Sequence, residues 1–253
     1  MRMLIAYLRF VAVIASMAIM VLAVILIQPF SLHFVQWQVR KLWTRCLIRS
    51  TGARLQIHGY PLTSVELANS MMVSNHISWL DTVVMLRLHF VRYIGKIEML
   101  NWPILKNVIK AGGTIFINRK NKKDLIAVNQ QVANLLINGA TVGLFPEGKT
   151  TLGVGVMPFK APILEAARIA NSKIYPVVLS YRKENNIRAQ EVSFVNVGWL
   201  TTVLNTLRLR NLVINVTVLP PVMALDFADR ESLSDYLHQE ISACYQQQQC
   251  VDE

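Results

Sequence analysis

The chain has 253 residues, of which 53% are hydrophobic and 16% are charged, and its formal net charge is +11. This length suits one sizeable domain with a full core, and the high apolar content predicts additional lipid-facing surface. The positive charge fits an anionic membrane surface or a phosphorylated substrate. Nucleic acid is a less favoured partner, because no basic–aromatic stacking pattern or nucleic-acid motif accompanies the charge.

The N-terminal segment, residues 1–50, is predicted to be a membrane anchor. No residue from Phe10 to Ile27 is charged, and a helix of this length rises roughly 27 Å, close to the hydrocarbon thickness of ~30 Å. The stretch Leu32–Ile48 mixes tryptophans with basic residues, a pattern typical of an interfacial helix. A cleaved signal peptide is the alternative, but no clear cleavage site follows the apolar run. Basic residues flank both ends of the first helix, so the charge pattern leaves open its orientation and whether it spans the bilayer.

Residues 51–253 are predicted to form a single α/β domain, because apolar runs alternate with amphipathic segments. This order favours a mostly parallel sheet flanked by helices. The predicted strands are Asn69–Ser74, Val91–Gly95, Gly113–Asn118, Thr141–Phe145, Ile174–Tyr181, Val192–Val197 and Leu212–Leu219. The predicted helices are Trp79–Leu88, Pro103–Lys110, Lys123–Asn138, Pro162–Asn171 and Asp229–Tyr245.

The three cysteines indicate the redox compartment. Cys46, Cys244 and Cys250 are odd in number and widely spaced, which argues against a disulfide framework or a zinc site. We therefore expect free thiols in a reducing compartment, with the catalytic domain on the cytosolic side of the membrane.

The segment Asn75–Asp81 carries the main catalytic candidate. It follows the apolar run Met71-Met72-Val73, a predicted strand, so His76 should lie at the carboxyl end of that strand, where open α/β sheets bind ligands. Ser78 and Asp81 have the spacing of a helix N-terminal capping box, which would place the Asp81 carboxylate within reach of His76. Histidine can accept a hydroxyl proton near neutral pH, and a carboxylate can fix its tautomer. On spacing alone, a capped helix with an incidental histidine is the interpretation that the residues favour.

Four short segments resemble, in order, the signature blocks of the 1-acyl-sn-glycerol-3-phosphate acyltransferase family. Asn75–Asp81 is similar to its Asn-His-x-Ser-x-x-Asp block. The later blocks correspond to Gly113–Arg119, Phe145–Gly148 and Tyr175–Val177. Lys96, Glu98 and Trp102-Pro103 also match a family stretch. The resemblance spans about residues 70–180 and implies a membrane-bound acyltransferase.

The resemblance also implies roles for individual residues. His76 would be the base for the acceptor hydroxyl, and Asp81 would support it. Arg119 would bind the acceptor phosphate, for which a guanidinium is suited because it bonds two phosphate oxygens at once. Glu147 and Gly148 would lie near the glycerol portion of the acceptor. A solvated basic turn around Arg119 is the alternative that the residues alone favour.

Block three departs from the common family pattern. Lys149-Thr150 follows Gly148 where many members have threonine and then a phosphate-binding arginine. Lys149 would supply a charge only as a point cation from a neighbouring position. This form looks more like branches that act on lysophospholipids or lyso-ornithine lipid. The family resemblance as a whole implies lysophosphatidate as the acceptor, and the altered third block favours the alternative, lyso-ornithine lipid or a lysophospholipid.

The expected reaction transfers an acyl group from acyl-CoA or acyl-carrier protein directly to a lysolipid hydroxyl, in phospholipid biosynthesis. No motif requires a metal or a resident cofactor. A catalytically silent lipid-binding protein is one competing hypothesis. Nucleotide hydrolysis is another, because Gly143–Thr150 matches the phosphate-binding loop pattern. However, Gly143 falls inside a predicted strand and a poor helix-forming segment follows Lys149.

Overall fold

A computed structural model describes residues 2–27, 33–62, 67–97, 101, 113–117 and 122–250. Its strands are β1 (Arg54–Gly59), β2 (Ser70–Ser74), β3 (Val91–Lys96), β4 (Ile115–Ile117), β5 (Thr141–Leu144), β6 (Lys173–Arg182), β7 (Val213–Val218) and β8 (Val222–Met223). Its α-helices are α1 (Arg2–Ile27), α2 (His33–Ser50), α3 (Leu80–Leu88), α5 (Lys122–Ile137), α6 (Glu165–Ile169), α7 (Trp199–Arg208) and α8 (Arg230–Cys250). Short 3-10 turns cover Ala161–Leu164, Glu184–Asn186, Gln190–Val192 and Ala224–Asp226.

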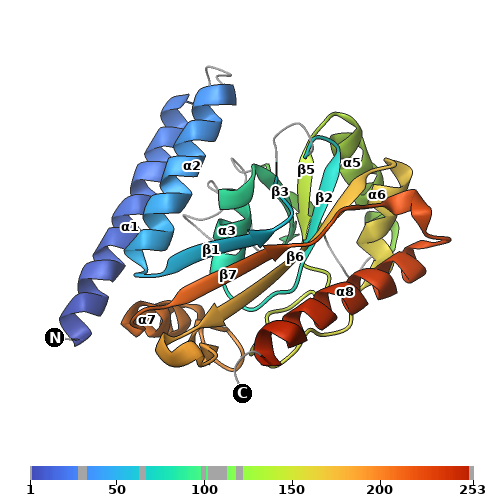
Figure 1. Cartoon of the computed structure of the whole chain (residues 1–253). Helices are drawn as coiled ribbons and strands as arrows, with labels where there is room; N and C mark the ends of the chain where they lie inside the picture. Colours follow the sequence, from blue (N-terminus) through green and yellow to red (C-terminus); the bar gives the residue numbers. More distant parts are fainter. Residues whose placement is uncertain are drawn as a thin grey trace.

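The strands form one sheet in the order β1-β7-β6-β2-β5-β3-β4, with β8 paired to β6 (Figure 1). The five strands from β6 to β4 run parallel, whereas β7 and β8 are antiparallel to β6 and β1 is parallel to β7. Every residue of β2 and β5 is buried, as expected for parallel strands covered on both faces. The predicted α/β fold with a mostly parallel sheet is therefore confirmed.

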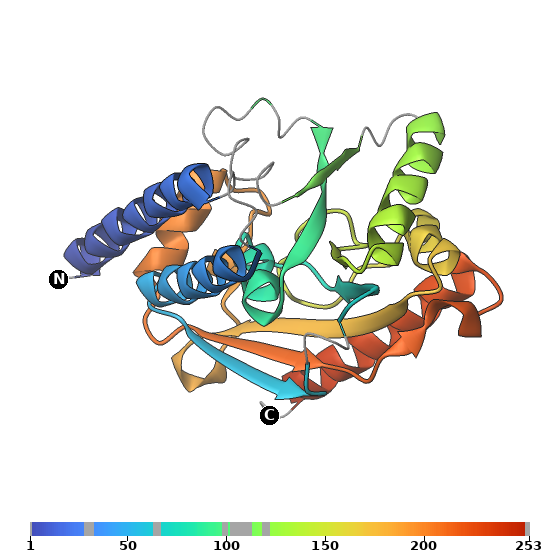
Figure 2. The same cartoon turned by 90° about the horizontal axis from the view of Figure 1, so that it is seen from above.

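Helices cover both faces of the sheet, with α8 along one face and α2 and α3 on the other (Figure 2). Successive side chains of β6 make the two faces explicit, because alternate residues of a strand point in opposite directions. The Tyr181 hydroxyl bonds Asp81 in α3, whereas the Arg182 guanidinium bonds the Gln248 carbonyl in α8. Neighbouring residues of one strand thus connect the sheet to helices on opposite sides.

The first two helices form a hairpin that packs onto the domain (Figure 1). Val13 of α1 and Leu47 and Ile48 of α2 belong to the same buried apolar cluster as the sheet. Arg9 donates to the backbone carbonyls of Leu207, at 2.9 Å, and Leu209, at 2.5 Å. Residues 1–50 therefore contribute to the core, and the predicted domain boundary at residue 50 stays a prediction.

The outer face of α1 is apolar and exposed. Met3–Ala23 is long and apolar enough to cross a membrane, and it is the one such segment among the described residues. Leu4 and Leu8 are 61% and 58% exposed. A mostly buried core helix would not present such a surface, so α1 is a candidate for contact with lipid.

Some predicted elements differ from the structure. The strand predicted at Val192–Val197 is wrong, because a 3-10 turn ends at Val192 and Asn196 adopts a left-handed conformation with φ 59°. Strand β1 was not predicted; it is a mostly exposed edge strand whose polar sequence gives little apolar alternation. Helix α7 and strand β8 were also not predicted. The helix predicted at Pro103–Lys110 lies outside the described residues.

Candidate active site

The candidate site begins where β2 ends, at the carboxyl edge of the parallel strands. The Asn75 side chain exchanges two hydrogen bonds with the Leu179 backbone: its Nδ2 donates to the carbonyl at 2.9 Å, and its Oδ1 accepts from the amide at 2.8 Å. The amide side chain thereby takes the place of a backbone partner for β6. The chain can leave the sheet at this point without exposing unpaired groups of the neighbouring strand.

His76 and Asp81 form the pair that their spacing predicts. The distance between His76 Nδ1 and Asp81 Oδ2 is 2.7 Å, with 20% of the His76 side chain exposed and none of the Asp81 side chain. The same Asp81 oxygen accepts from the amides of Ile77 and Ser78. Because an ionised carboxylate only accepts hydrogen bonds, Nδ1 carries the proton and Nε2 is the basic nitrogen of the neutral ring.

The start of α3 brings this carboxylate to the histidine. The Leu80 amide donates to Ser78 Oγ at 3.2 Å, and the Ser78 amide donates to Asp81 Oδ2 at 2.9 Å. One half of the capping box that the Ser78–Asp81 spacing indicates is therefore present, because Asp81 accepts from the Ser78 amide, but the Ser78 oxygen accepts from Leu80 and not from the Asp81 amide. The helix N-terminus also favours the negative charge of Asp81.

One aromatic ring, that of Phe145, packs against the imidazole of His76. The ring stacks on Phe145 with centroids 4.3 Å apart and planes 17° apart. Tyr93 lies parallel to the same phenylalanine at 6.0 Å and donates its hydroxyl to the Thr82 carbonyl. Nε2 has no hydrogen-bond partner within the described part of the chain. The basic nitrogen is thus uncommitted, and its ring is partly open to solvent.

Glu147 binds the backbone on both sides of the site. Its Oε1 accepts from the His76 amide at 2.6 Å and its Oε2 from the Met157 amide at 3.0 Å, and the side chain is 2% exposed. Burial raises the pKa of the Glu147 carboxyl to about 7, although these two amides favour the ionised form. Both oxygens are occupied by the protein itself, which suits a residue that fixes His76.

The carbonyl of His76 is held as firmly as its amide. It accepts from the amide of Thr151 at 2.9 Å and from the Thr151 hydroxyl at 3.3 Å. The Gly153 carbonyl in turn accepts from the buried Tyr245 hydroxyl at 2.6 Å, which connects this loop to α8. The segment that follows β5 therefore positions the backbone of His76 from two directions.

The structure brings together some of the predicted site residues and not others. His76, Asp81 and Glu147 are connected by hydrogen bonds. Gly148 follows Glu147 in a left-handed conformation with φ 74°, which glycine adopts without strain. Lys149 is exposed. Arg119 lies outside the described residues, so its role stays a prediction.

The sequence did not predict the contacts that three residues make with the site: Tyr181, Phe145 and Thr151. Tyr181 donates to Asp81 Oδ1 at 2.5 Å from a position 100 residues along the chain. Within an apolar strand-like run, such a tyrosine is indistinguishable from an ordinary core residue. Phe145 belongs to block three, so its block was predicted but its stacking contact was not.

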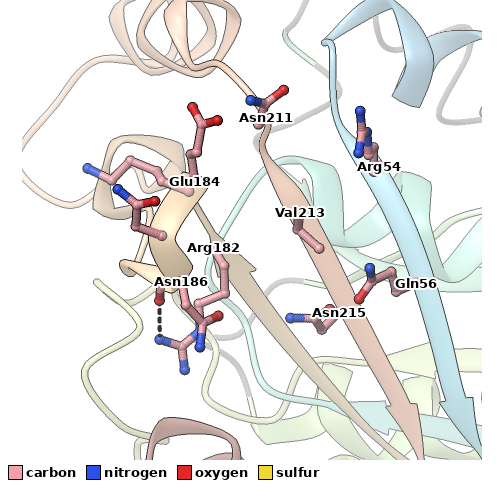
Figure 3. Close-up of a pocket in the computed structure, with 10 residues that line it drawn as sticks. Arg54, Gln56, Arg182, Glu184, Asn186, Asn211, Val213 and Asn215 are labelled. Carbon is pink, nitrogen blue, oxygen red and sulfur yellow. Dashed lines mark hydrogen bonds between the residues drawn. The ribbon is translucent and has the colours of Figure 1, made fainter. Parts of the chain in front are cut away.

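A hollow formed by described residues lies elsewhere, over β1, β6 and β7 (Figure 3). It measures about 400 Å³, and polar side chains such as Arg54, Gln56 and Asn215 line it. Arg182 borders it while donating to the Asn186 carbonyl and to α8. None of its lining residues belongs to the His76 network, so the hollow is not the candidate active site.

The apparent phosphate-binding loop begins inside a strand, because β5 runs to Leu144. Gly143 lies in β5, and a Cβ atom there would come within 2.5 Å of Val91 and 2.7 Å of Tyr93. The glycine therefore permits close packing of β5 against β3. No helix begins within residues 149–160, all of which are described. The site lacks the loop-to-helix geometry that binds nucleotide phosphates.

Comparisons with known proteins identify the family of the chain. The model of the family described as Acyltransferase matches residues 56–180. The chain is 34% identical to a 1-acyl-sn-glycerol-3-phosphate acyltransferase of Neisseria gonorrhoeae over 179 residues, which cover 70% of each chain. It is 30% identical to a lyso-ornithine lipid O-acyltransferase of Brucella abortus over 69% of this chain and 68% of that one. The chain belongs to the acyltransferase family.

A solved structure supports the fold. The crystal structure of the 1-acyl-sn-glycerophosphate acyltransferase from Thermotoga maritima matches with a TM-score of 0.72, covering 98% of this chain and 97% of that one. The sequence identity is 16%, so this likeness concerns the fold. It covers α1 and α2 as well as the sheet.

Proposed function

We propose that this acyltransferase moves a fatty acyl group from a thioester donor to the free hydroxyl of a lysolipid, with 1-acyl-sn-glycerol-3-phosphate as acceptor and phosphatidic acid as product. The observation that carries the proposal is the His76–Asp81 pair, because Asp81 fixes the tautomer that leaves Nε2 basic. The sequence similarity to acyltransferases for this acceptor supports it.

In the proposed mechanism, Nε2 of His76 takes the proton of the acceptor hydroxyl while its oxygen attacks the thioester carbonyl carbon. Asp81 stabilises the imidazolium that forms. The carbon–sulfur bond then breaks, and the departing thiolate receives the proton from His76. The products are an ester and a free thiol, and no covalent acyl-enzyme is formed. Acyl-CoA and acyl-carrier protein both supply the required thioester.

The remaining predicted residues position the catalytic histidine or bind the acceptor headgroup. Glu147 holds the backbone of His76, so we assign it a positioning role. Gly148 permits the turn that follows, beside the glycerol portion of the acceptor. Arg119 binds the acceptor headgroup in this proposal, and the exposed Lys149 adds positive charge near it.

A second acceptor has its own support. Block three lacks the arginine that often follows the glutamate and glycine in the family, and Lys149 stands beside its position. Curated relatives that match this chain include lyso-ornithine lipid O-acyltransferases of Brucella abortus and Pseudomonas aeruginosa. Lyso-ornithine lipid carries no phosphate, so it is the alternative acceptor if the headgroup contact is not a phosphate clamp.

We also propose that the protein binds the cytosolic face of the inner membrane through the α1–α2 hairpin. The exposed apolar face of α1 is suited to lipid, and α2 contributes basic and aromatic groups. Lys41 lies 4.6 Å from the Trp37 ring centroid, and Arg40 lies 4.0 Å from that of Phe90. Such pairs are suited to the interface, where an aromatic body and a charged head both find partners.

The decisive experiment compares acceptors on purified protein in mixed micelles. With an acyl-CoA donor, we measure kcat/KM for lysophosphatidate and for lyso-ornithine lipid of the same acyl chain. A preference of at least about tenfold for lysophosphatidate, equivalent to roughly 1.4 kcal/mol, supports the proposed acceptor. The reverse preference supports the alternative, and transfer to neither acceptor contradicts the proposed function.

A further inference from the structure

The Asp81 carboxylate is more completely enclosed than a pairing with His76 requires. It is fully buried and accepts four hydrogen bonds. Three of the donors bond Oδ2, and they all come from the loop immediately before the helix: His76 Nδ1 and the amides of Ile77 and Ser78. The fourth donor is the Tyr181 hydroxyl, which bonds Oδ1 at 2.5 Å.

Tyr181 differs from the other donors in where it comes from. Within the described part of the chain, it is the one donor to Asp81 that lies outside residues 76–81. It belongs to β6, a buried strand in the middle of the sheet. The loop donors move together with the loop, whereas Tyr181 connects the carboxylate to the rigid part of the fold.

The second oxygen needs such a partner for two reasons. A buried carboxylate oxygen without a donor retains its full desolvation cost. In addition, the torsion that rotates an aspartate carboxylate is broad, so bonds to one oxygen leave the group free to twist. A donor on Oδ1 fixes the plane of the carboxylate, and the plane determines the direction in which Nδ1 of His76 must point.

We propose that Tyr181 is a positioning residue, which locks the Asp81 carboxylate and thereby orients His76 for proton transfer. This inference rests on the proposed function. Tyr181 is buried beneath Asp81, so it acts through that residue and does not touch the substrate. Burial, followed by the charge of Asp81, raises the pKa of the Tyr181 hydroxyl well above its ordinary value, so the group remains a donor at physiological pH.

The first test is Tyr181→Phe, with Tyr236→Phe on α8 as the control. Each variant keeps its ring, and the ring of Tyr236 packs against Phe227. We expect Tyr181→Phe to lower kcat about 5- to 30-fold with KM values within about twofold of wild type, because the loss concerns the transition state. The acid limb of the kcat/KM profile should move to higher pH, since the carboxylate keeps more negative charge beside the imidazolium. Tyr236→Phe should change neither.

A double-mutant cycle with Asp81→Asn separates positioning from packing. If Tyr181 acts through Asp81, adding Tyr181→Phe to Asp81→Asn should change kcat by less than about twofold. A full additional loss in the double variant, or a Tyr181→Phe enzyme with wild-type kcat and pH profile, overturns the inference. Wild type and His76→Ala are assayed alongside. An inactive wild type or a fully active His76→Ala contradicts the proposed function instead, so the two failures are distinct.

Discussion

The loop Asn75–Asp81 and the helix α1 represent opposite solutions to the placement of side chains. In the loop, polar groups are withdrawn from water and nearly every one is hydrogen-bonded, with Asp81 fully buried. In α1, large apolar side chains such as Leu4 and Leu8 point into solvent. Burying polar groups and exposing large apolar side chains both cost free energy in water, so each arrangement points to a function.

The two regions have different roles: the loop determines the reaction, and the helix determines where the enzyme binds. The buried polar network defines what the site can do, because it fixes one tautomer of His76 and leaves Nε2 open. The exposed apolar helix defines where the enzyme works, because lipid is the environment that such a surface fits. Disrupting each region should therefore affect a different measurement.

The largest effect should come from His76→Ala. Removing a general base costs about 10²- to 10⁴-fold in turnover, while membrane binding should stay near wild type. The assay is release of free thiol from acyl-CoA in the presence of lysophosphatidate. His58→Ala, on the exposed edge strand β1, is the control and should retain full activity. Turnover of His76→Ala within a few-fold of wild type would remove the catalytic assignment.

Arg119→Ala should rank next. Loss of a charge-assisted bidentate phosphate contact costs about 2–4 kcal/mol, or roughly 30- to 1000-fold in kcat/KM for lysophosphatidate. Arg119→Lys should recover only part, because an ammonium lacks the planar fork. Lys149→Ala should be milder, since Lys149 is exposed. An equal loss with a phosphate-free lysolipid would show that Arg119 is not a phosphate clamp.

The membrane side of the comparison can be tested without unfolding the protein. Deleting residues 1–50 would strip Leu47 and Ile48 from the core. The double substitution Leu4→Glu, Leu8→Glu instead alters exposed positions. Burying a leucine side chain contributes about 1.5–3 kcal/mol, so binding to phosphatidylglycerol vesicles should weaken by more than about tenfold.

The control for this experiment is activity on a micelle-dispersed acceptor, which should stay within about twofold of wild type because the His76 network is intact. Vesicle sedimentation equal to wild type would mean that another surface holds the membrane. Equal loss of activity in vesicles and micelles would mean that the substitutions disturb the fold.

How much of the site the sequence predicts depends on how local its contacts are. His76 and Asp81 lie within one loop and helix turn, so their spacing permits the contact between them that the structure shows. Tyr181 and Thr151 reach the same loop from distant segments, and nothing in their neighbourhoods distinguishes them from ordinary strand or loop residues. Their contacts depend on strand order, which local patterns do not fix.

The fold follows the same rule. Strands β2, β5 and β6 were predicted because buried strands are continuous apolar runs, and β7 because its burial alternates along an apolar segment. The edge strand β1 is mostly exposed and reads as a polar segment. The false strand at Val192–Val197 has the right composition, but the left-handed Asn196 turns the chain there. Single-residue backbone conformations of this kind override composition.

Glu147→Gln should mainly affect the free energy of unfolding, and this effect should depend on pH in a distinctive way. The glutamine oxygen can accept from only one of the two amides, so its NH2 group faces the other amide, which is also a donor. This mismatch lowers the free energy of unfolding by about 1–3 kcal/mol. Because burial raises the pKa of Glu147 to about 7 in the folded state, its stabilising contribution is present in full below its unfolded-state pKa and declines as pH rises through about 7.

The stability gap between wild type and Glu147→Gln should therefore be largest at about pH 5 and should narrow by about pH 8, by up to about 3 kcal/mol. Urea unfolding across this range, at constant detergent and salt, measures it. A gap that is constant with pH, or that widens as pH rises, would contradict the raised pKa of the carboxyl.

The most direct test of the central claim is the stoichiometry of the reaction catalysed by the purified wild-type protein. Free thiol and diacyl product are measured in the same samples, with acyl-CoA and with or without lysophosphatidate, by thiol reagent and mass spectrometry. Direct acyl transfer, with His76 as the base for the acceptor hydroxyl, predicts one free thiol for each phosphatidic acid formed. It also predicts no thiol release without the acceptor. Thiol release that does not require the acceptor, accompanied by free fatty acid, would show that the site hydrolyses thioesters and would contradict the account.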